Sequence, residues 1–385
     1  MSNASRVLKI VAAALAVSGI LFVIRSEPTE AVPLPAAAKY LGNVQTGNPG
    51  FQSMGRMSFG PDAVLLISDP QAASIVAIDT GDRGPVVKLK KRIDNVRGLI
   101  ASGVGAKPSE VEIVDMAVNR KSGTIYLAVH RQADKQFALL TIDGNGKLSN
   151  FALESARYVR IALPGDAKVR NITDVEFAGD RVLAAGQSNE EFASKIYSLP
   201  LPLVHGSSAA IFSAETYHVS HKRWETKAPI QSFVPHEENG KSYVVGSFSC
   251  TPIAKFPVDE LSSGAHVKGE SIVELGSGNR PLDMFTYERD GKSWLVTNTY
   301  RFHFKRSLFG RSKWWGVRVS MDYLSSDATN ENAPTRDVTK KSGPEGIEIV
   351  DALFGAIEVD KLNDNEMVVL RDADGELGLE VARLP

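Results

Sequence analysis

Three aspartates occupy matching places in three similar stretches of the chain. Asp115, Asp174 and Asp283 each stand at the start of a short run of apolar and β-branched residues of the kind that forms strands. Asn171 and Asn279 lie a few residues upstream of two of them. Carboxylate and amide oxygens are the hard ligands that Ca²⁺ prefers. If the strands converge, these residues form a candidate metal site, with Ca²⁺ as the one candidate cofactor.

The same aspartates also have a structural interpretation. An aspartate at the head of a strand accepts hydrogen bonds from backbone N–H groups of a neighbouring segment, and so joins one repeat to the next. The metal interpretation lacks a fourth ligand at a fixed spacing, which Ca²⁺ sites built on one loop provide. Both interpretations therefore stay open for Asp115, Asp174 and Asp283.

A basic and aromatic stretch runs from residue 301 to residue 318. It holds six Lys or Arg residues and no acidic residue. The alternation of aromatic and β-branched residues on either side of it predicts a long hairpin with a basic tip. The tip is a candidate surface for anionic lipid, polysaccharide or an acidic protein, with tryptophan and phenylalanine as apolar anchors. The candidate partner-binding residues are Arg301, Lys305, Arg306, Phe309, Arg311, Lys313, Trp314 and Trp315. The alternative is an outer hairpin with solvated charges and aromatics packed on a neighbouring sheet.

Composition excludes several classes of function. The 44 basic residues against 45 acidic residues give no overall field for nucleic acid, so electrostatic recognition must be local. The single cysteine, Cys250, excludes an internal disulfide framework and a cysteine-type zinc site. The segment Gly246–Ser249 is not a nucleophile elbow between a strand and a helix, so no sequence motif indicates nucleophilic catalysis.

The first 35 residues form a separate segment. Arg6 and Lys9 precede an uncharged apolar run of 15 residues, from Ile10 to Ile24. This pattern is typical of an export signal, and the run is shorter than the ~20 residues that span a bilayer. We therefore expect a signal peptide or signal anchor over 1–35, a single domain over 36–385, and a periplasmic or extracellular location, with membrane attachment if the segment is retained.

The rest of the chain is a succession of short strand-like runs separated by turn residues. Three-strand units recur six times, and Asp115, Asp174 and Ser232 follow one another at intervals of 59 and 58 residues. Units of this length cannot bury both faces of a sheet alone, so radial stacking is favoured. We predict an all-β fold, a β-propeller of six four-stranded blades, with residues 40–44 as the outer strand of the last blade. Two β-sandwich domains are the alternative.

Several phrases resemble a group of uncharacterised bacterial exported propeller-like proteins, broadly akin to NHL and YVTN repeat proteins. The resemblance covers roughly residues 50 to 300 and departs from the pattern at 299–323. It implies a propeller in an extracytoplasmic setting and carries over no activity. The phrases are Phe59–Asp62, Ile75–Asp82, Ser188–Ala193, Ser249–Ile253 and Asn279–Met284.

Two classes of function follow. The first is an exported binding or scaffold protein of the cell envelope that uses the basic hairpin to hold a partner. The second is a calcium-dependent lactonase or esterase-like hydrolase, resembling six-bladed calcium-dependent lactonases, that uses Asp115, Asp174 and Asp283 at a central channel. Whether the chain is an enzyme stays open.

Overall fold

The computed structural model describes residues 39–385, apart from 165–167, 219–221, 250–251, 259–262, 277, 311, 326–334, 337–340 and 343. The expected export segment therefore lies outside the described residues, as do Cys250 and Arg311. In the described ranges, no helix combines the length and the apolar character needed to cross a membrane.

Antiparallel sheets account for most of the described chain, so the prediction of an all-β fold is confirmed. The first sheet contains β2 (Gln45–Thr46), β3 (Met57–Phe59), β4 (Val64–Asp69), β5 (Ser74–Asp79) and β10 (Arg157–Ala162). The second contains β6 (Val111–Val118), β7 (Ile125–Arg131), β8 (Gln136–Ile142) and β9 (Leu148–Asn150). The last contains β27 (Ala356–Lys361), β28 (Glu366–Ala373) and β29 (Glu376–Arg383).

The middle of the chain forms the largest sheet and one further four-stranded sheet. The largest contains β11 (Val169–Ala178), β12 (Arg181–Ser188), β13 (Ser194–Pro200), β15 (Ala210–His218), β20 (His266–Glu274), β19 (Pro252–Pro257), β18 (Lys241–Phe248) and β17 (Ile230–Glu238), with β16 (Arg223–Glu225) beside β15. The other contains β21 (Asn279–Arg289), β22 (Lys292–Arg301), β23 (Trp314–Ser320) and β26 (Ile347–Ile349). Two short pairs, β1 (Leu41–Gly42) with β14 (Leu203–Val204) and β24 (Thr335–Arg336) with β25 (Lys341–Ser342), complete the sheets.

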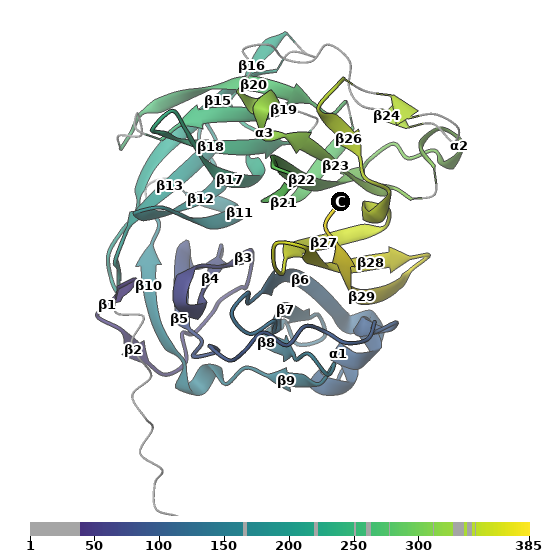
Figure 1. Cartoon of the computed structure of the whole chain (residues 1–385). Helices are drawn as coiled ribbons and strands as arrows, with labels where there is room; N and C mark the ends of the chain where they lie inside the picture. Colours follow the sequence, from purple (N-terminus) through teal and green to yellow (C-terminus); the bar gives the residue numbers. More distant parts are fainter. Residues whose placement is uncertain are drawn as a thin grey trace, which may run out of the picture. The chain divides into compact units, whose positions relative to one another are not determined.

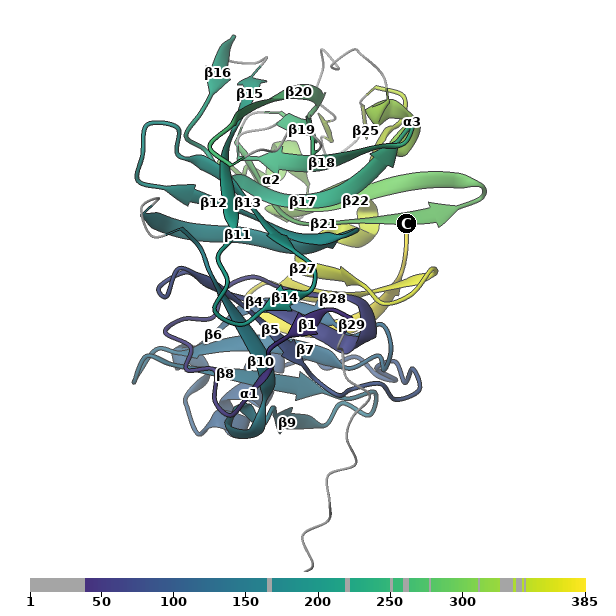
Figure 2. The ribbon, with the colours of Figure 1, turned by 90° about the vertical axis from the view of Figure 1, so that its left-hand side faces the viewer.

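The sheets are arranged in a propeller-like manner around a common centre. The strands β3, β6, β27, β21, β17 and β11 contact one another in that order, and β11 contacts β3 again. Figure 1 shows these strands facing the centre, and the turned view in Figure 2 shows β27 between β21 and the second sheet. Because each sheet covers its neighbours, the buried apolar side chains form several clusters between sheets rather than one central core.

The prediction of six separate four-stranded blades is not confirmed. Among the described residues, hydrogen bonding defines five larger sheets with different numbers of strands. There are five rather than six because β15 and β20 pair in parallel and join two groups of four strands into one sheet. The last sheet has three strands, and only an isolated bridge between Ile93 and Leu379 extends it. The strands themselves lie where the repeating phrases predict them.

The predicted closure by residues 40–44 is wrong. β1 pairs in parallel with β14, and β2 pairs with β10, so neither strand joins the last sheet. The sequence also gave no sign that β10, which follows the second sheet along the chain, would return to pair with β5 of the first sheet.

One helix was not expected from the repeats. α1 spans Val96–Val104, begins with the Asn95 side chain accepting a hydrogen bond from Gly98 N, and ends at Gly105 with φ of +66°. Its buried residues Val96 and Ile100 pack in the apolar cluster between the second and last sheets. Two single-turn helices, α2 (Arg306–Phe309) and α3 (Met321–Leu324), flank β23.

Candidate functional site

Each of five innermost strands has a register irregularity at the same place. In β6, β11 and β17 the irregularity falls immediately before Asp115, Asp174 and Ser232. In β21 it spans the position of Asp283, and in β27 it falls just before Glu358. A β-bulge bends its strand and re-aims the side chain beside it. The repeated bulge therefore explains why these polar side chains reach the centre of the fold.

The aspartates join neighbouring innermost strands. Asp115 Oδ2 accepts a hydrogen bond of 2.6 Å from Met57 N in β3, and Asp174 Oδ2 accepts one of 2.7 Å from Phe233 N in β17. Asp283 Oδ2 accepts one of 2.9 Å from Val359 N in β27. These bonds satisfy backbone donors that no strand partner reaches, and they are the contacts that the structural interpretation of the aspartates requires.

A fourth aspartate makes the same kind of bond. Asp360 Oδ2 accepts a hydrogen bond of 2.7 Å from Val118 N, and so links the last sheet to the second. Asp360 stands at the end of its strand-like run rather than at the head, so its position in the sequence did not distinguish it.

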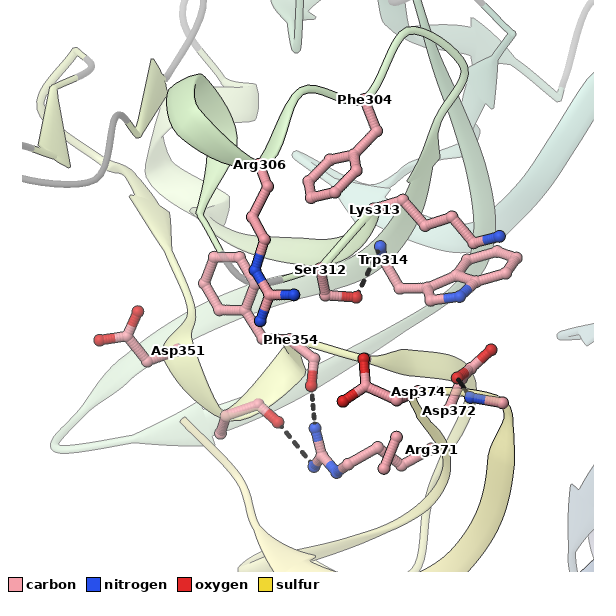
Figure 3. A pocket seen from close by; sticks show the side chains of 14 residues that line it. Phe304, Arg306, Ser312, Lys313, Trp314, Asp351, Phe354, Arg371, Asp372 and Asp374 are labelled. Carbon is pink, nitrogen blue, oxygen red and sulfur yellow. Dashed lines mark hydrogen bonds between the residues drawn. The ribbon is translucent and has the colours of Figure 1, made fainter.

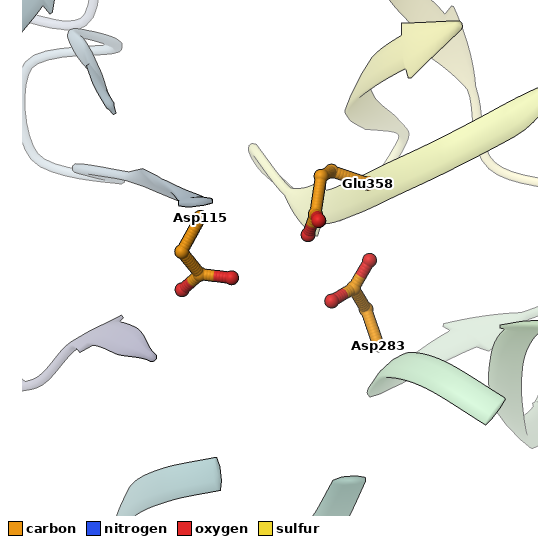
Figure 4. A group of neighbouring side chains, drawn as sticks. All are labelled: Asp115, Asp283 and Glu358. Carbon is orange, nitrogen blue, oxygen red and sulfur yellow. The ribbon is translucent and has the colours of Figure 1, made fainter. Parts of the chain in front are cut away.

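The cation among the central carboxylates is an arginine of the chain itself. Arg56 Nη1 lies 2.6 Å from Asp115 Oδ1, 3.4 Å from Glu358 Oε2 and 3.6 Å from Asp283 Oδ1. Among the described residues, Asp115, Asp283 and Glu358 are the group of acidic side chains whose ligand atoms lie within 4.8 Å of one another. Figure 4 shows the three carboxylates pointing toward a common point. The guanidinium supplies the positive charge that a metal would otherwise bring.

Burial raises the pKa values of the central carboxyl groups. It raises the pKa of Asp174 to about 6 and that of Asp283 to about 7, against opposing effects of Arg56 and of backbone donors. The pKa values of Glu176 and Glu358 are raised well above the usual range, first by burial and then by neighbouring carboxylates. The centre thus favours bound protons over a full set of negative charges.

The residues predicted as calcium ligands are only partly brought together. Asp115 and Asp283 belong to the group around Arg56, and Asp174 bonds instead to the backbone of the next strand. Asn279 is fully buried, and its Oδ1 accepts a hydrogen bond of 2.9 Å from Trp315 Nε1. Asn171 Oδ1 is buried without a hydrogen-bond partner among the described residues. Binding of Ca²⁺ at the centre stays a prediction.

The central cavity is small. It has a volume of about 50 Å³ and is lined by Arg56, the acidic side chains and residues such as Ser58 and Ser232. Since one water molecule takes about 30 Å³ of liquid, this space is suited to an ion or one or two waters and not to an organic substrate. A ligand of larger size must therefore bind elsewhere.

A larger groove lies beside the basic and aromatic stretch. β22 and β23 pair antiparallel from Trp294 opposite Ser320 to Tyr300 opposite Trp314, which confirms the predicted hairpin. Its connection contains the single helical turn α2, which the alternation did not predict. The groove, about 750 Å³ in volume, runs between this connection and the turn that joins β28 to β29.

The two walls of the groove carry opposite charges. One wall holds Arg306 and Lys313 with Phe304 and Trp314, and the other holds Asp372 and Asp374 (Figure 3). Hydrogen bonds of 3.0 Å from Gly355 N to Trp314 O and of 2.8 Å from Asp372 N to Gly355 O hold the walls together. Arg371 forms the floor and donates to the carbonyl oxygens of Ala352 and Phe354.

Trp314 is the centre of an aromatic and cationic group. Its ring centroid lies 4.6 Å from that of Tyr300, and Lys313 Nζ lies 5.4 Å above its ring. Its indole N–H is buried without a hydrogen-bond partner among the described residues. A buried donor without a partner is costly.

The other residues predicted to bind a partner lie in different surroundings. Lys305 is exposed but does not line the groove. Trp315 is 3% exposed, and the Arg301 guanidinium stacks 4.6 Å from its ring, so both belong to the interior of the sheet. Phe309 lies in α2, its side chain is not described, and Arg311 lies outside the described residues.

The central cluster contains residues that sequence reasoning missed. Glu358 occupies the position after the bulge in the last repeat, so aligning that repeat with Asp115 could have found it. Arg56 precedes β3, in the first repeat, and no sequence signal distinguished it from other basic residues.

Comparison with known proteins gives remote structural similarity only. No model of a known protein family matches the chain, and no curated protein matches its sequence. The PQQ-bound aldose sugar dehydrogenase from Streptomyces coelicolor is 12% identical, with 89% of this chain and 98% of that chain covered and a TM-score of 0.33. A protein proposed to be a gluconolactonase is 9% identical, with coverages of 89% and 92% and a TM-score of 0.30. The endo-arabinase from Bacteroides thetaiotaomicron is 10% identical, with coverages of 70% and 93% and a TM-score of 0.35.

Proposed function

We propose that this chain is an exported binding protein that holds an acidic polysaccharide in the groove between the β22–β23 connection and the β28–β29 turn. The observation that carries the proposal is the lining of the groove: Arg306 and Lys313 beside the indole of Trp314 on one wall, and Asp372 and Asp374 on the other. The export signal expected over 1–35 supports the cell envelope as the place of action.

The chemistry of acidic sugars matches both walls. Their carboxylates pair with arginine and lysine, their hydroxyl groups donate to aspartate, and the apolar face of a sugar ring packs on an aromatic ring. The groove thus offers interaction partners for the carboxylates, the hydroxyl groups and the apolar ring faces of an acidic polysaccharide.

An anionic lipid surface fits this groove less well. A membrane presents a flat array of negative headgroups, and Asp351, Asp372 and Asp374 at the groove would face that array with the same sign of charge. A concave site of about 750 Å³ also suits a chain segment better than a surface.

The fold supports such a role by fixing the walls of the groove on different sheets. We also propose that the β11–β15 and β17–β20 portions of the nine-stranded sheet act as two separate blades, so that the propeller has six blades. The closed cycle of contacts between the six innermost strands supports this count. A rigid ring that carries variable connections is a common basis for binding sites.

Isothermal titration with polygalacturonate oligomers tests the proposal, with a neutral glucan and phosphatidylglycerol vesicles as alternative ligands. We expect binding of the acidic oligomer, weakened at high salt and by the double change Arg306→Ala and Lys313→Ala by about tenfold or more. Lys305→Ala is the matched control, because Lys305 lies in the same connection but not in the groove.

Equal loss in the Lys305→Ala variant, or unchanged binding in the double variant, would show that the groove does not hold the ligand. Binding to the vesicles but not to the oligomer would replace polysaccharide with a lipid surface and overturn the proposed function.

A further inference from the structure

A second group of reactive side chains lies on the nine-stranded sheet, away from the centre and from the groove. Ser213 and Glu215 are two residues apart on β15, so their side chains share one face of the sheet. Lys195 on β13 stands opposite Ser213, and His266 on β20 is the parallel partner of Ser213 on the other side. Three adjacent strands thus place a serine, a histidine, a glutamate and a lysine on the same face.

Two of these side chains already contact each other in the manner of a catalytic base and its orienting acid. His266 Nδ1 lies 3.2 Å from Glu215 Oε1. A carboxylate at Nδ1 favours the tautomer with hydrogen on that nitrogen, which leaves the Nε2 lone pair free to accept a proton. Phe192 packs edge-on against the imidazole ring, with centroids 4.4 Å apart, and limits its rotation.

The Ser213 hydroxyl oxygen accepts a hydrogen bond from a lysine side chain. Lys195 Nζ donates a hydrogen bond of 3.0 Å to Ser213 Oγ and pairs with Glu190 at 2.6 Å. The hydrogen bond from Lys195 lowers the pKa of Glu190. Lys195 is therefore placed as a hydrogen-bond donor to an oxygen at this position.

Ser213 and His266 line one pocket of about 340 Å³, together with Phe192, Ile211 and Phe212. As a donor, the Ser213 hydroxyl makes a 3.5 Å contact with Phe192 O, at the limit of hydrogen bonding, so its hydrogen is easily turned elsewhere. The two side chains stand on neighbouring strands, which lie about 4.8 Å apart. Catalytic hydrogen bonds are commonly long before substrate binds.

From this arrangement we infer that Ser213, His266 and Glu215 form a hydrolytic site for small esters, with Lys195 as the electrophilic donor. The apolar side chains of Phe192 and Ile211 in the pocket lining suit a short acyl group. This site is independent of the polysaccharide groove and does not depend on the function proposed for it.

The reaction balances with water as the only co-reactant. Ser213 Oγ adds to the ester carbonyl carbon while His266 Nε2 takes the hydroxyl proton, and the Lys195 ammonium stabilises the negative oxygen. Collapse breaks the carbon–oxygen bond of the ester, and His266 returns the proton to the departing alcohol. Water, activated by His266, then hydrolyses the acyl-serine to release the acid and restore Ser213.

Sequence patterns could not reveal this site, because its members come from three strands and no nucleophile motif surrounds Ser213. Only the parallel pairing of β15 with β20 brings His266 beside Ser213. The inference therefore rests on tertiary placement alone.

Labelling of the full chain with a fluorophosphonate, followed by peptide mass mapping, tests the inference together with hydrolysis of p-nitrophenyl acetate. We expect label on Ser213, loss of label and of hydrolysis in Ser213→Ala, and a rate about 10²–10⁴-fold lower in His266→Gln. Ser208→Ala, an exposed serine nearby, is the control and keeps the parent rate.

His266 is 47% exposed, so its replacement leaves the fold intact even if Ser213→Ala impairs folding. Absence of label on Ser213 in the folded parent, label on another serine, or an unchanged rate in His266→Gln would each overturn the inference.

Discussion

The guanidinium of Arg56 lies 2.6 Å from the carboxylate of Asp115, and the same Asp115 accepts a hydrogen bond from Met57 N. The Asp115 side chain therefore joins the first and second sheets by an ion pair with Arg56 and by a hydrogen bond from the backbone of Met57. Removing one partner of a buried ion pair leaves the other charge uncompensated, which costs about 3–5 kcal/mol. The centre of the fold is thus held by a small number of polar contacts with large individual effects.

Arg56→Ala is expected to lower the free energy of unfolding by about 3–5 kcal/mol, measured by urea denaturation. Arg181→Ala is the matched control, because the Arg181 pair with Asp180 is exposed and is expected to contribute at most about 1 kcal/mol. Similar losses in the two variants would contradict the special role of Arg56.

Asp174→Ala is expected to destabilise the chain by about 1–3 kcal/mol, since it leaves Phe233 N without its acceptor. Asp174→Asn keeps an oxygen in that position and is expected to lose much less. Thermal melting of both variants measures the difference. A loss in Asp174→Asn as large as that in Asp174→Ala would mean that charge, and not the hydrogen bond to β17, is what matters.

Stability is expected to fall as pH rises from about 4 to about 7. Acids whose pKa is raised on folding, such as Asp174 at about 6 and Asp283 at about 7, hold protons in the folded state that the unfolded chain releases. This stabilisation is present at low pH and is lost as pH passes the folded pKa values. His236, whose pKa burial lowers, acts in the opposite direction, and so do carboxyl groups whose pKa a lysine partner lowers, such as Glu190 and Glu238, but these carboxyl groups act mainly below about pH 5.

Melting temperatures between pH 5 and pH 8 measure this dependence. Asp283→Asn, which carries no charge at any pH, is expected to flatten the profile. Melting temperatures that rise steadily over this range in the parent chain would show that the central carboxyl groups do not control its stability.

Replacing Arg56 with Gln is expected to create a calcium response. The change leaves Asp115, Asp283 and Glu358 within 4.8 Å of one another without their cation. Millimolar Ca²⁺ should then raise the melting temperature of Arg56→Gln more than that of the parent, because a ligand that binds only the folded state stabilises it. Equal shifts in the two proteins would place the calcium effect elsewhere.

Replacing Trp314 with Phe removes the indole N–H and keeps an aromatic ring, so this variant tests the two parts of the side chain separately. The variant keeps a ring beside Lys313, and the indole N–H that it loses is buried, so we expect polygalacturonate to bind Trp314→Phe nearly as tightly as the parent and Trp314→Ala more weakly. Titration calorimetry on the three proteins gives the order. Identical affinities would remove Trp314 from the proposed binding site.

The positions of strands were largely predictable from the sequence, because short β-branched runs between turn residues specify them locally. The approach of Asp115 and Asp283 to each other followed from their matching places in the repeats, whereas Asp174 lines the same central cavity but bonds to the backbone of β17. Pairing between distant strands was less predictable. β10 returning to β5 and β15 joining β20 depend on contacts between segments far apart in sequence, for which turn chemistry gives no signal.

The candidate sites were likewise predictable where their residues are close in sequence and not where distant segments meet. Arg306, Lys313 and Trp314 were recognisable as a basic and aromatic group, but the opposite wall with Asp372 and Asp374 comes from a turn about sixty residues later. Trp315 looked equivalent to Trp314, yet the alternation along β23 turns it into the interior. Arg56 could be identified only when the innermost strands are seen together.

The return of β10 to the first sheet affects the order in which a nascent chain can fold. The outer partner of β5 leaves the ribosome only after residue 162 has been made, when all four strands of the second sheet are already available. The first sheet therefore has one unpaired edge, that of β5, until β10 has been synthesised. A ribosome stalled before residue 157 would carry a chain in which the open edge of β5 is especially prone to pair with other edges.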